Sequence, residues 1–239
     1  MTKIVDLASE GLADLPATCR ACVFWEVAHA ERGPSRDGSG CAAKESAWQA
    51  TQLEWGSGGK AAYVDGQCVG YAMMGPPQHT PRVRHLGWST SDDAMVLATI
   101  WVDAEWRGEG IGRALLQACL SETHRRGAQA LEAVAERQGV QPSSCVLPVE
   151  FLLANGFTVL HDRGHYPLLR LDLSQTVRWS LSHALDAVLE RLGRRVRVGR
   201  PALPASRSVS SERLKPAQRD RYDAISGTGD GQACCASKK

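Results

Sequence analysis

The alternation of apolar and polar residues divides the first part of the chain into segments that predict strands and helices. Apolar runs predict strands at residues 3–7, 95–102, 130–135, 158–161 and 168–173. Two further runs, 61–64 and 68–73, flank the dipeptide Asp65-Gly66 and predict a tight hairpin. Apolar residues spaced three and four positions apart predict helices that begin near Gly11 and that cover 44–55, 111–126 and 146–154. The polar segments 29–44 and 78–93 are expected to be loops.

The chain changes character after residue 173. One more amphipathic pattern, which includes Val177 and Leu192, ends at Gly193. The residues beyond it are rich in arginine, serine, glycine and aspartate, and such a segment cannot bury enough apolar surface to order itself. We therefore expect a domain over residues 1–175, a helix over 176–194 that packs on it, and a basic, disordered tail over 195–239.

Composition narrows the class of protein only slightly. Of the 239 residues, 43% are hydrophobic, which is enough for a packed core, and the formal net charge of +2 carries little information. The first residues lack the features of an export signal and no apolar run could span a bilayer, so we expect a cytoplasmic protein whose eight cysteines remain thiols. Cys19 and Cys22 have the spacing of half a zinc site, but without a second pair we expect no metal and interpret them as small apolar core residues.

A glycine-rich loop joins the strand 95–102 to the helix 111–126. Its residues are Arg107, Gly108, Glu109, Gly110, Ile111, Gly112, Arg113 and Ala114. Alternating glycines let several backbone N–H groups face one ligand, and the helix adds its unpaired first-turn amides and the positive end of its dipole. A Rossmann loop would need glycine where Arg113 stands, and a Walker loop would need a Gly-Lys-Ser/Thr that is absent. The loop therefore predicts a site for a phosphate or a pyrophosphate.

The remaining pattern, Arg107-x-x-Gly110-x-Gly112, resembles the pyrophosphate loop of the GNAT superfamily of acyl-CoA-dependent N-acetyltransferases. In that family the pattern is Arg or Gln, two residues, Gly, one residue, and then Gly or Ala. The strand before it ends in Val-x-Pro-x-aromatic. Val102 and Trp106 match this strand end, whereas the proline is missing.

A second match to the family is Gly156-Phe157, which follows an apolar helix. The resemblance covers residues 4–173. It implies an α/β (α+β) fold in which a mixed, mostly antiparallel sheet contains a splayed central parallel pair and carries helices on both faces. The order of the predicted elements, with a strand on either side of the helix 111–126, agrees with this arrangement.

The resemblance also implies acetyl-CoA as cosubstrate, with its pyrophosphate in the loop and no metal. Its pantetheine arm would run along the backbone of Ile100, Trp101 and Val102, where an N–H group can stabilise the charge that grows on the thioester oxygen as an amine attacks. Direct transfer then needs a base for the ammonium proton and an acid for the CoA thiolate. The acceptor, a small molecule or a protein, and the length of the acyl chain cannot be identified from the residues.

The chain departs from the family at the residues that would carry protons in the reaction. Leu152 replaces the tyrosine usually cast as the acid, and a leucine cannot donate a proton. Cys145, near the predicted start of a helix, is the candidate acid because such a position can lower the pKa of a thiol, although a packing contact with CoA would explain it equally well. Glu132 and Glu136 share one face of their strand, and Glu132 is the candidate base, directly or through water; surface carboxylates are the alternative interpretation.

Trp25 and Glu26 are the candidates for binding the acceptor, because an aromatic wall and an anion suit a cationic amine. A core tryptophan beside a solvated glutamate is the plainer alternative. A catalytically weak CoA-binding regulatory or interaction module is a second possible function, which Leu152 and the C-terminal extension would permit. We expect no membrane partner and no nucleic-acid partner, because no aromatic residues interleave with the arginines of 191–200, and a homodimer is left open.

Overall fold

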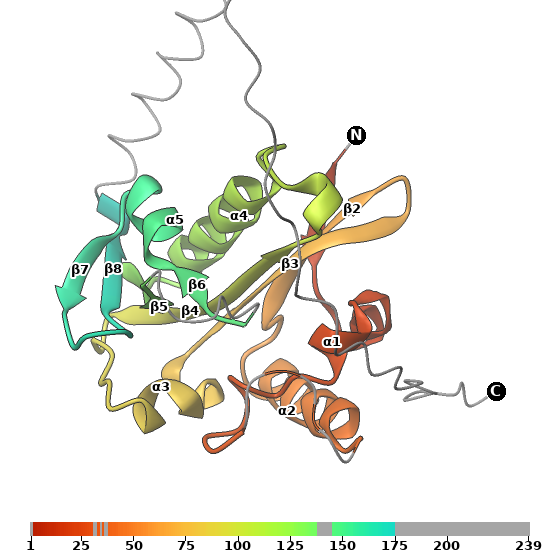
Figure 1. Ribbon diagram of the computed structural model, residues 1–239, viewed down its shortest axis with the longest axis horizontal. Helices are drawn as coiled ribbons and strands as arrows, with labels where there is room; N and C mark the ends of the chain where they lie inside the picture. The colour runs from red at the N-terminus through yellow and green to blue at the C-terminus, as the bar shows by residue number, and fades with distance from the viewer. Residues whose placement is uncertain (1, 31–32, 34, 36–37, 138–144, 175–239) are drawn as a thin grey trace, which may run out of the picture. The chain divides into compact units, whose positions relative to one another are not determined.

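One sheet runs through the centre of the molecule, which is seen here in a computed structural model (Figure 1). The structure describes residues 2–30, 33, 35, 38–137 and 145–174. Along the sheet the strands are β1 (Lys3–Asp6), β2 (Gly59–Val64), β3 (Gln67–Gly75), β4 (Ala94–Val102), β5 (Ala130–Glu136), β8 (Leu168–Asp172) and β7 (Thr158–His161), and β6 (Leu147–Pro148) pairs with β5. The Asp65-Gly66 turn between β2 and β3 has positive φ at both residues, 48° and 83°, as a two-residue hairpin turn requires.

The strand pairs are antiparallel except for two, β4 with β5 and β5 with β6, which are parallel. The pairing of β4 with β5 ends at Val96 and Glu132, although both strands continue beyond these residues. The two strands therefore separate over their second halves. This splayed parallel pair is the feature of the fold that positions the candidate site.

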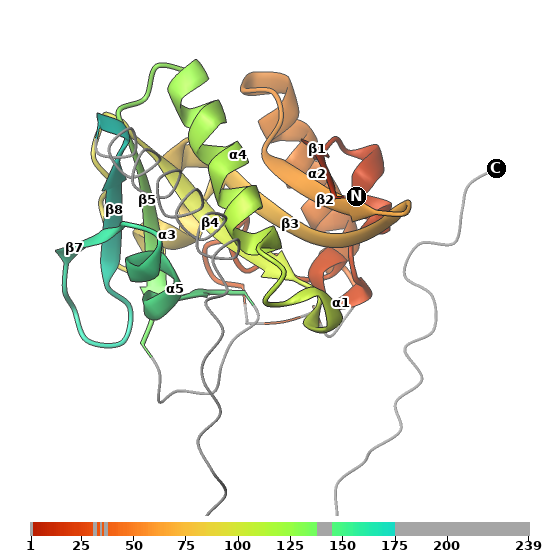
Figure 2. The same ribbon diagram turned by 90° about the horizontal axis from the view of Figure 1, so that it is seen from above.

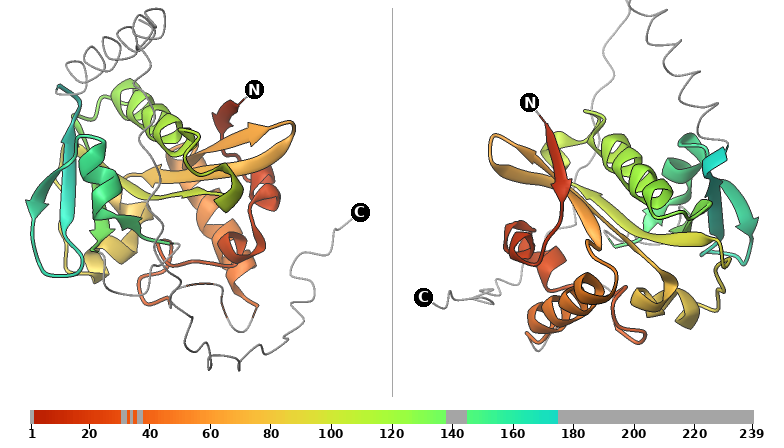
Figure 3. Two further views of the ribbon diagram at one scale, coloured as in Figure 1. Left: turned by 45° about the horizontal axis from the view of Figure 1, so that its top comes forward. Right: turned by 180° about the vertical axis from the view of Figure 1, so that it is seen from behind.

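Helices cover both faces of the sheet (Figures 1 and 3). α4 (Ile111–Arg125) and α5 (Val149–Ala154) lie on one face, where α4 crosses β2, β3 and β4 (Figure 2). The opposite face carries η1 (Glu10–Asp14), α1 (Ala17–Arg20), α2 (Gly40–Glu54), η2 (Pro77–His79) and α3 (Pro81–His85), and η3 (Ala104–Trp106) follows β4. Buried aliphatic residues such as Leu115 fill the first interface, whereas Trp48, Phe24 and other aromatic residues fill the second. The predicted fold class is confirmed.

Four predicted elements differ from the structure: α2 begins at Gly40 instead of residue 44, and proline explains the other three differences. The helix expected near Gly11 is the 3-10 helix η1, because Leu15 precedes Pro16 and is extended. The segment 78–93 is not all loop, since Pro81 opens the short helix α3. The helix expected over 146–154 begins only at Val149, because Pro148 is extended and pairs with β5 instead.

The expected C-terminal helix over 176–194 and the tail over 195–239 lie outside the described residues. The described residues belong to one compact unit, Met1–His183, and the second unit, Ala184–Lys239, is wholly outside them. Within the described part of the chain, no helix combines the length and the apolar character needed to cross a membrane.

Glu122 connects the C-terminal end of α4 to β2. Its side chain is 7% exposed, accepts a hydrogen bond of 2.6 Å from Arg126 Nε, and lies 3.4 Å from Lys60 Nζ on β2. The pKa of Glu122 is lowered from 4.5 to about 2. The hydrogen bond from Arg125 contributes most, and the hydrogen bond from Arg126 and the charge of Lys60 contribute less. The folded state therefore holds the ionised carboxylate more tightly than the unfolded chain does.

Because the pKa of Glu122 is lower in the folded state, its contribution to stability is present above pH 4.5 and is lost as the pH falls toward 2. We expect Glu122→Gln to lower the free energy of unfolding by about 2–3 kcal/mol at neutral pH. The difference from the parent protein should shrink steadily as the pH is lowered through this window. Urea unfolding of both proteins at several pH values measures this, and a loss independent of pH would contradict it.

Candidate active site

The glycine-rich loop has the backbone conformation that the sequence predicts for an anion site. Gly108 and Gly110 have φ of 86° and 81°, in the left-handed region that glycine favours, and Gly110 caps the start of α4. The amides of the first turn of α4 have no partner within the helix. A Cβ added at Gly108 or Gly110 would meet no atom of the described residues within 4 Å, so this part of the chain leaves space there that a ligand can enter.

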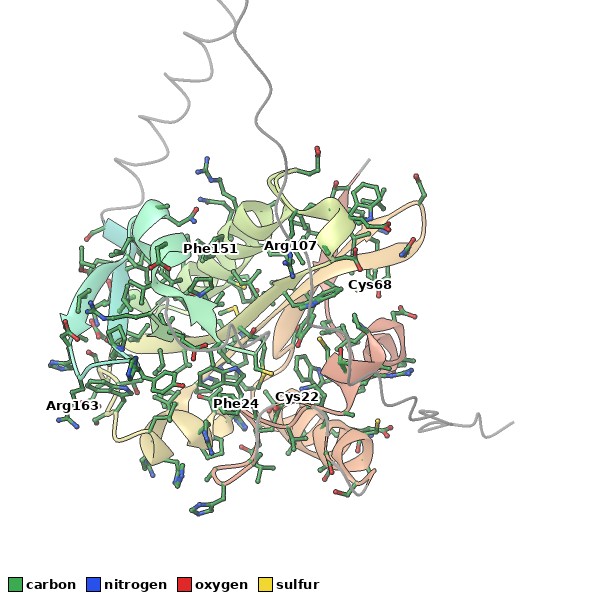
Figure 4. All side chains as sticks on the ribbon, in the orientation of Figure 1. Cys22, Phe24, Cys68, Arg107, Phe151 and Arg163 are labelled. Carbon is green, nitrogen blue, oxygen red and sulfur yellow. The ribbon has the colours of Figure 1, made fainter. Side chains whose placement is uncertain are left out.

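Arg107 joins this loop to the end of β4 (Figure 4). Its Nε donates a hydrogen bond of 3.1 Å to the carbonyl oxygen of Val102. The side chain of Asp103 accepts a bond from Glu105 N–H and caps η3 between the strand and the loop. The strand end and the loop are therefore held in a fixed relation.

The backbone of β4 directs N–H groups toward the gap beside β5, where no strand among the described residues pairs with it. The N–H of Asp103 donates to the carbonyl of Val69, 2.9 Å away, which fixes the alternation of hydrogen bonds between β4 and β3. By that alternation the N–H groups of Ile100 and Val102 point away from β3, toward the side where β5 no longer pairs. Two of the three predicted backbone donors thus face the gap.

Trp101, the third predicted donor, is oriented differently. Its backbone N–H points toward β3, opposite Tyr71, and is taken up by the sheet. Its ring lies beside that of Tyr71, with 6.3 Å between the ring centroids. Trp101 therefore contributes a side chain to the opposite face of the sheet and no amide to the gap.

An irregularity in β4 turns side chains toward that opposite face. Met73 pairs with Thr99 and Met74 with Leu97, so Ala98 is an extra residue on β4. Such a bulge bends a strand and re-aims its side chains. Thr99 consequently lines a cavity of about 160 Å³ between β3, β4 and the first helices.

This cavity brings together three of the residues that the sequence singled out. Trp25, Glu26 and Cys145 all line it, together with Cys22, Lys44 and Tyr71. The indole Nε1 of Trp25 donates a hydrogen bond of 2.7 Å to the carbonyl of Cys145, which ties two segments that are 120 residues apart. Trp25 is 3% exposed, so it is both a core residue and a wall of the cavity.

Glu26 is not a solvated glutamate. Its carboxylate forms an ion pair with Lys44 on α2, and the two side chains are 2% and 5% exposed. Lys44 Nζ also donates a bond of 2.8 Å to the carbonyl of Cys22. The cavity therefore contains a compensated pair of charges rather than an isolated anion.

Cys145 does not stand at the start of a helix, as the sequence had suggested. It lies four residues before Val149, where α5 begins, and precedes the short strand β6. The argument that a helix start lowers its pKa therefore does not apply. Its Sγ lies 3.1 Å from Cys22 Sγ, a contact that the sequence does not reveal.

Tyr71 is a cavity residue that the sequence analysis missed. It lies on β3 with its ring buried, and it lines the cavity together with Cys19. Burial raises the pKa of Tyr71 above its ordinary value. The alternation of the hairpin 67–75 could have placed Tyr71 on one face of the sheet, but only the packing of the first helices on that face forms the cavity.

Glu132 is held in a buried polar cluster. Its side chain is fully buried, and it accepts bonds of 3.1 Å from Arg170 Nη1 and from the N–H of Ser91. Arg170 also binds Asp93 and Asp172. Glu132 lies at the last paired position of β4 and β5, before the strands separate.

Glu136 lies four residues further along β5, on the same face and beside the separated end of β4. Its side chain accepts a hydrogen bond of 3.2 Å from the hydroxyl of Tyr166. β6, which follows Cys145, pairs with Ala135 and Glu136. Of the two carboxylates on this face, Glu136 is the nearer in the fold to the segment of Cys145.

The described residues contain no group of three or more His, Cys, Asp or Glu side chains that could hold a metal ion. Cys19 and Cys22 both line the cavity, and all six cysteines in the described part of the chain are thiols. Burial raises the pKa of Cys19, as expected of a thiol in the core.

Solved structures with a similar arrangement include several acetyltransferases. The PaiA N-acetyltransferase from Thermoplasma acidophilum, in complex with coenzyme A, is 15% identical with a TM-score of 0.48 and covers 72% of this chain and 99% of its own. An N-acetyltransferase from Staphylococcus aureus Mu50 is 18% identical with a TM-score of 0.49, over 72% and 99%. The ribosomal-protein-S18-alanine N-acetyltransferase from Escherichia coli is 17% identical with a TM-score of 0.42, over 72% and 94%.

The family itself is shown by sequence. Comparison with curated protein sequences found no match. The sequence profile of the acetyltransferase (GNAT) family, however, matches residues 24–143, which is half of the chain and includes the whole glycine-rich loop. The chain therefore belongs to the GNAT acetyltransferase family.

Proposed function

We propose that this protein is an N-acetyltransferase that moves an acetyl group from acetyl-CoA directly to a primary amine. The observation that carries the proposal is that two neighbouring segments, the open edge of β4 and the glycine-rich loop at the start of α4, both present backbone N–H groups. A pyrophosphate requires closely spaced N–H groups at a helix start, and a pantetheine arm requires an unpaired strand edge. Both occur here on adjacent segments.

The cosubstrate would bind along residues already predicted for it. The loop from Arg107 to Ala114 would hold the pyrophosphate, and the N–H groups of Ile100 and Val102 would face the pantetheine arm and the thioester. The free space above Gly108 and Gly110 supports this fit, because the loop is not filled by side chains of the described residues. No metal is needed for the transfer.

In the reaction the amine nitrogen attacks the thioester carbon, and the carbon–sulfur bond breaks. An N–H group of β4 stabilises the charge on the carbonyl oxygen more strongly in the transition state than before it. The ammonium proton leaves to a base, and the sulfur of CoA leaves as a thiolate that Cys145 protonates. Leu152 is fully buried in the core under α4, so no side chain from that position can serve as the acid.

Two carboxylates on β5, Glu132 and Glu136, are the candidates for the base. The catalytic role predicted for Glu132 stays a prediction, and its bonds to Arg170 and Ser91 suit a structural carboxylate. We assign the role of base to Glu136, which would take the ammonium proton directly or through water, because Glu136 lies where β4 and β5 have separated. Glu132 then positions β8 against β5 through Arg170.

Variants of the two carboxylates decide between these roles. We expect Glu132→Gln to lower the free energy of unfolding by about 2 kcal/mol, because it removes hydrogen bonds to a buried charge. We expect Glu136→Gln to lower kcat by about 100-fold with little change in stability, because it removes a proton acceptor. Thermal melting and steady-state turnover measure both, and the reverse pattern would return the role of base to Glu132.

The acceptor would enter the cavity lined by Trp25 and Glu26. Trp25 supplies an apolar wall, and Glu26 supplies a carboxylate that it shares with Lys44. A small-molecule or a protein amine would meet the same chemistry there. A cytoplasmic location and a homodimer stay predictions.

A CoA-binding module without catalysis is the second candidate, and the buried Leu152 is the observation that favours it. The test is to measure CoA release from acetyl-CoA across a panel of amines, beside calorimetric binding of acetyl-CoA to the same preparation. Binding with amine-dependent release supports the transferase. Binding with no release from any amine supports the module.

A further inference from the structure

Two thiols from distant parts of the chain meet at the wall of the cavity. Cys22 Sγ and Cys145 Sγ are 3.1 Å apart, although 123 residues separate them in the sequence. Cys22 is 8% exposed and Cys145 is half-buried. Cys22 lies below the end of β4, at a different place in the fold from Cys68 in the β2–β3 hairpin (Figure 4).

Side chains hold both backbones in this relation. Lys44 Nζ donates to the carbonyl of Cys22, 2.8 Å away, and Trp25 Nε1 donates to the carbonyl of Cys145, 2.7 Å away. A disulfide has a sulfur–sulfur distance of about 2 Å, so the two sulfurs need to approach by only about 1 Å. Rotation of the two cysteine side chains can supply most of such a movement.

We propose that Cys22 and Cys145 are a redox modification site, at which hydrogen peroxide converts the two thiols into a disulfide across the acceptor cavity. In the first step the thiolate of one cysteine attacks a peroxide oxygen, the oxygen–oxygen bond breaks, and a sulfenic acid and hydroxide form; the hydroxide takes up the proton that the thiol released and becomes water. In the second step the other thiolate attacks the sulfenic sulfur and displaces a second water. Two thiols and one peroxide thus give one disulfide and two water molecules.

The environments of the two thiols indicate which cysteine reacts first. The hydrogen bond to Cys145, together with burial, raises the pKa of Cys22, so Cys22 is the poorer first nucleophile. Both thiols line the cavity, and Cys145 is the more exposed of the two. Cys145 therefore reacts first, and Cys22, beside the ammonium group of Lys44, closes the bond.

The consequence for activity rests on the proposed function. The disulfide removes the proton that Cys145 would give to the CoA thiolate. It also ties the segment before α2 to the segment before β6. Oxidation would therefore stop acetyl transfer reversibly, and a dithiol reductant would restore it.

The test is to treat the full-length protein with hydrogen peroxide, block the remaining thiols by alkylation, digest it without reduction and map linked peptides by mass spectrometry. We expect a Cys22–Cys145 peptide that disappears on reduction with dithiothreitol. Cys22→Ser should abolish it, whereas the matched variant Cys68→Ser should retain it. Peroxide treatment that leaves both cysteines as thiols, over-oxidises them singly, or links Cys145 mainly to Cys19 or another cysteine would overturn the proposal.

Because mapping needs no substrate, this result is separate from the test of acetyl transfer. If the disulfide is found in a protein that shows no turnover, the proposed modification site is supported and the proposed transferase function is rejected. Where turnover is present, peroxide should abolish it in the parent protein and in Cys68→Ser, and dithiothreitol should recover it in both. Full activity of a protein whose Cys22–Cys145 peptide is fully linked would overturn the regulatory consequence.

Discussion

Replacing Gly112 with glutamate is expected to abolish detectable binding of acetyl-CoA. Gly112 is the second residue of α4, where the backbone N–H groups of the first turn point at the predicted pyrophosphate. A carboxylate there would repel the negatively charged pyrophosphate and would occupy the space that the pyrophosphate needs. The same substitution should not weaken the helix, because a negative side chain near a helix N-terminus is favourable.

The matched control for this variant is Gly112→Ala. A Cβ at Gly112 would meet Phe151 at 3.5 Å and Val102 at 3.7 Å, which are ordinary contacts, so the alanine should fold and bind. Gly110→Glu is a less clean variant, because Gly110 has a φ of 81° that strains any other residue. Isothermal titration calorimetry of the two Gly112 variants measures the effect. Equal affinity of Gly112→Glu and the parent would show that the phosphate site lies elsewhere.

Replacing Cys145 with alanine is expected to lower kcat by about 100-fold, because it removes a general acid that acts in the transition state. The affinity for acetyl-CoA should change little, since the loop and the edge of β4 are untouched. Steady-state kinetics and calorimetry separate the two quantities, and thermal melting reports whether the fold is retained. Cys68→Ala is the matched control, because Cys68 is half-buried in the β2–β3 hairpin and does not line the cavity.

The pH profile adds a readout that loss of packing would not change. If Cys145 gives its proton to the thiolate, the alkaline limb of the kcat profile should belong to Cys145 and should be absent from Cys145→Ala. Unchanged turnover in Cys145→Ala would return Cys145 to a packing role and leave a bound water as the proton donor.

Local signals account for what the sequence predicted well. The Asp65-Gly66 turn and the three-and-four spacing of α4 each depend on a few neighbouring residues, and both are confirmed. The parallel relation of β4 and β5 follows from the helix between them. Positive φ at Gly108 and Gly110 likewise follows from the residues of the loop itself.

Long-range packing decides what the sequence could not show. The ion pair of Glu26 with Lys44 and the contact of Cys22 with Cys145 join segments whose proximity no local pattern encodes. Thr99 reaches the cavity because an extra residue, Ala98, shifts the alternation of β4. The prolines could have been given more weight, because Pro148 alone explains why α5 starts late and leaves Cys145 outside it.

The open edge of β4 and the glycine-rich loop together are expected to support acetyl transfer to an amine. The most direct measurement incubates the full-length protein with acetyl-CoA and a panel of amines, and follows free CoA and acetylated amine together by mass spectrometry. We expect equal amounts of the two products with at least one amine, and neither product with Gly112→Glu. Acetyl-CoA binding without acetylated product from any amine, or product formation that Gly112→Glu leaves intact, would contradict it.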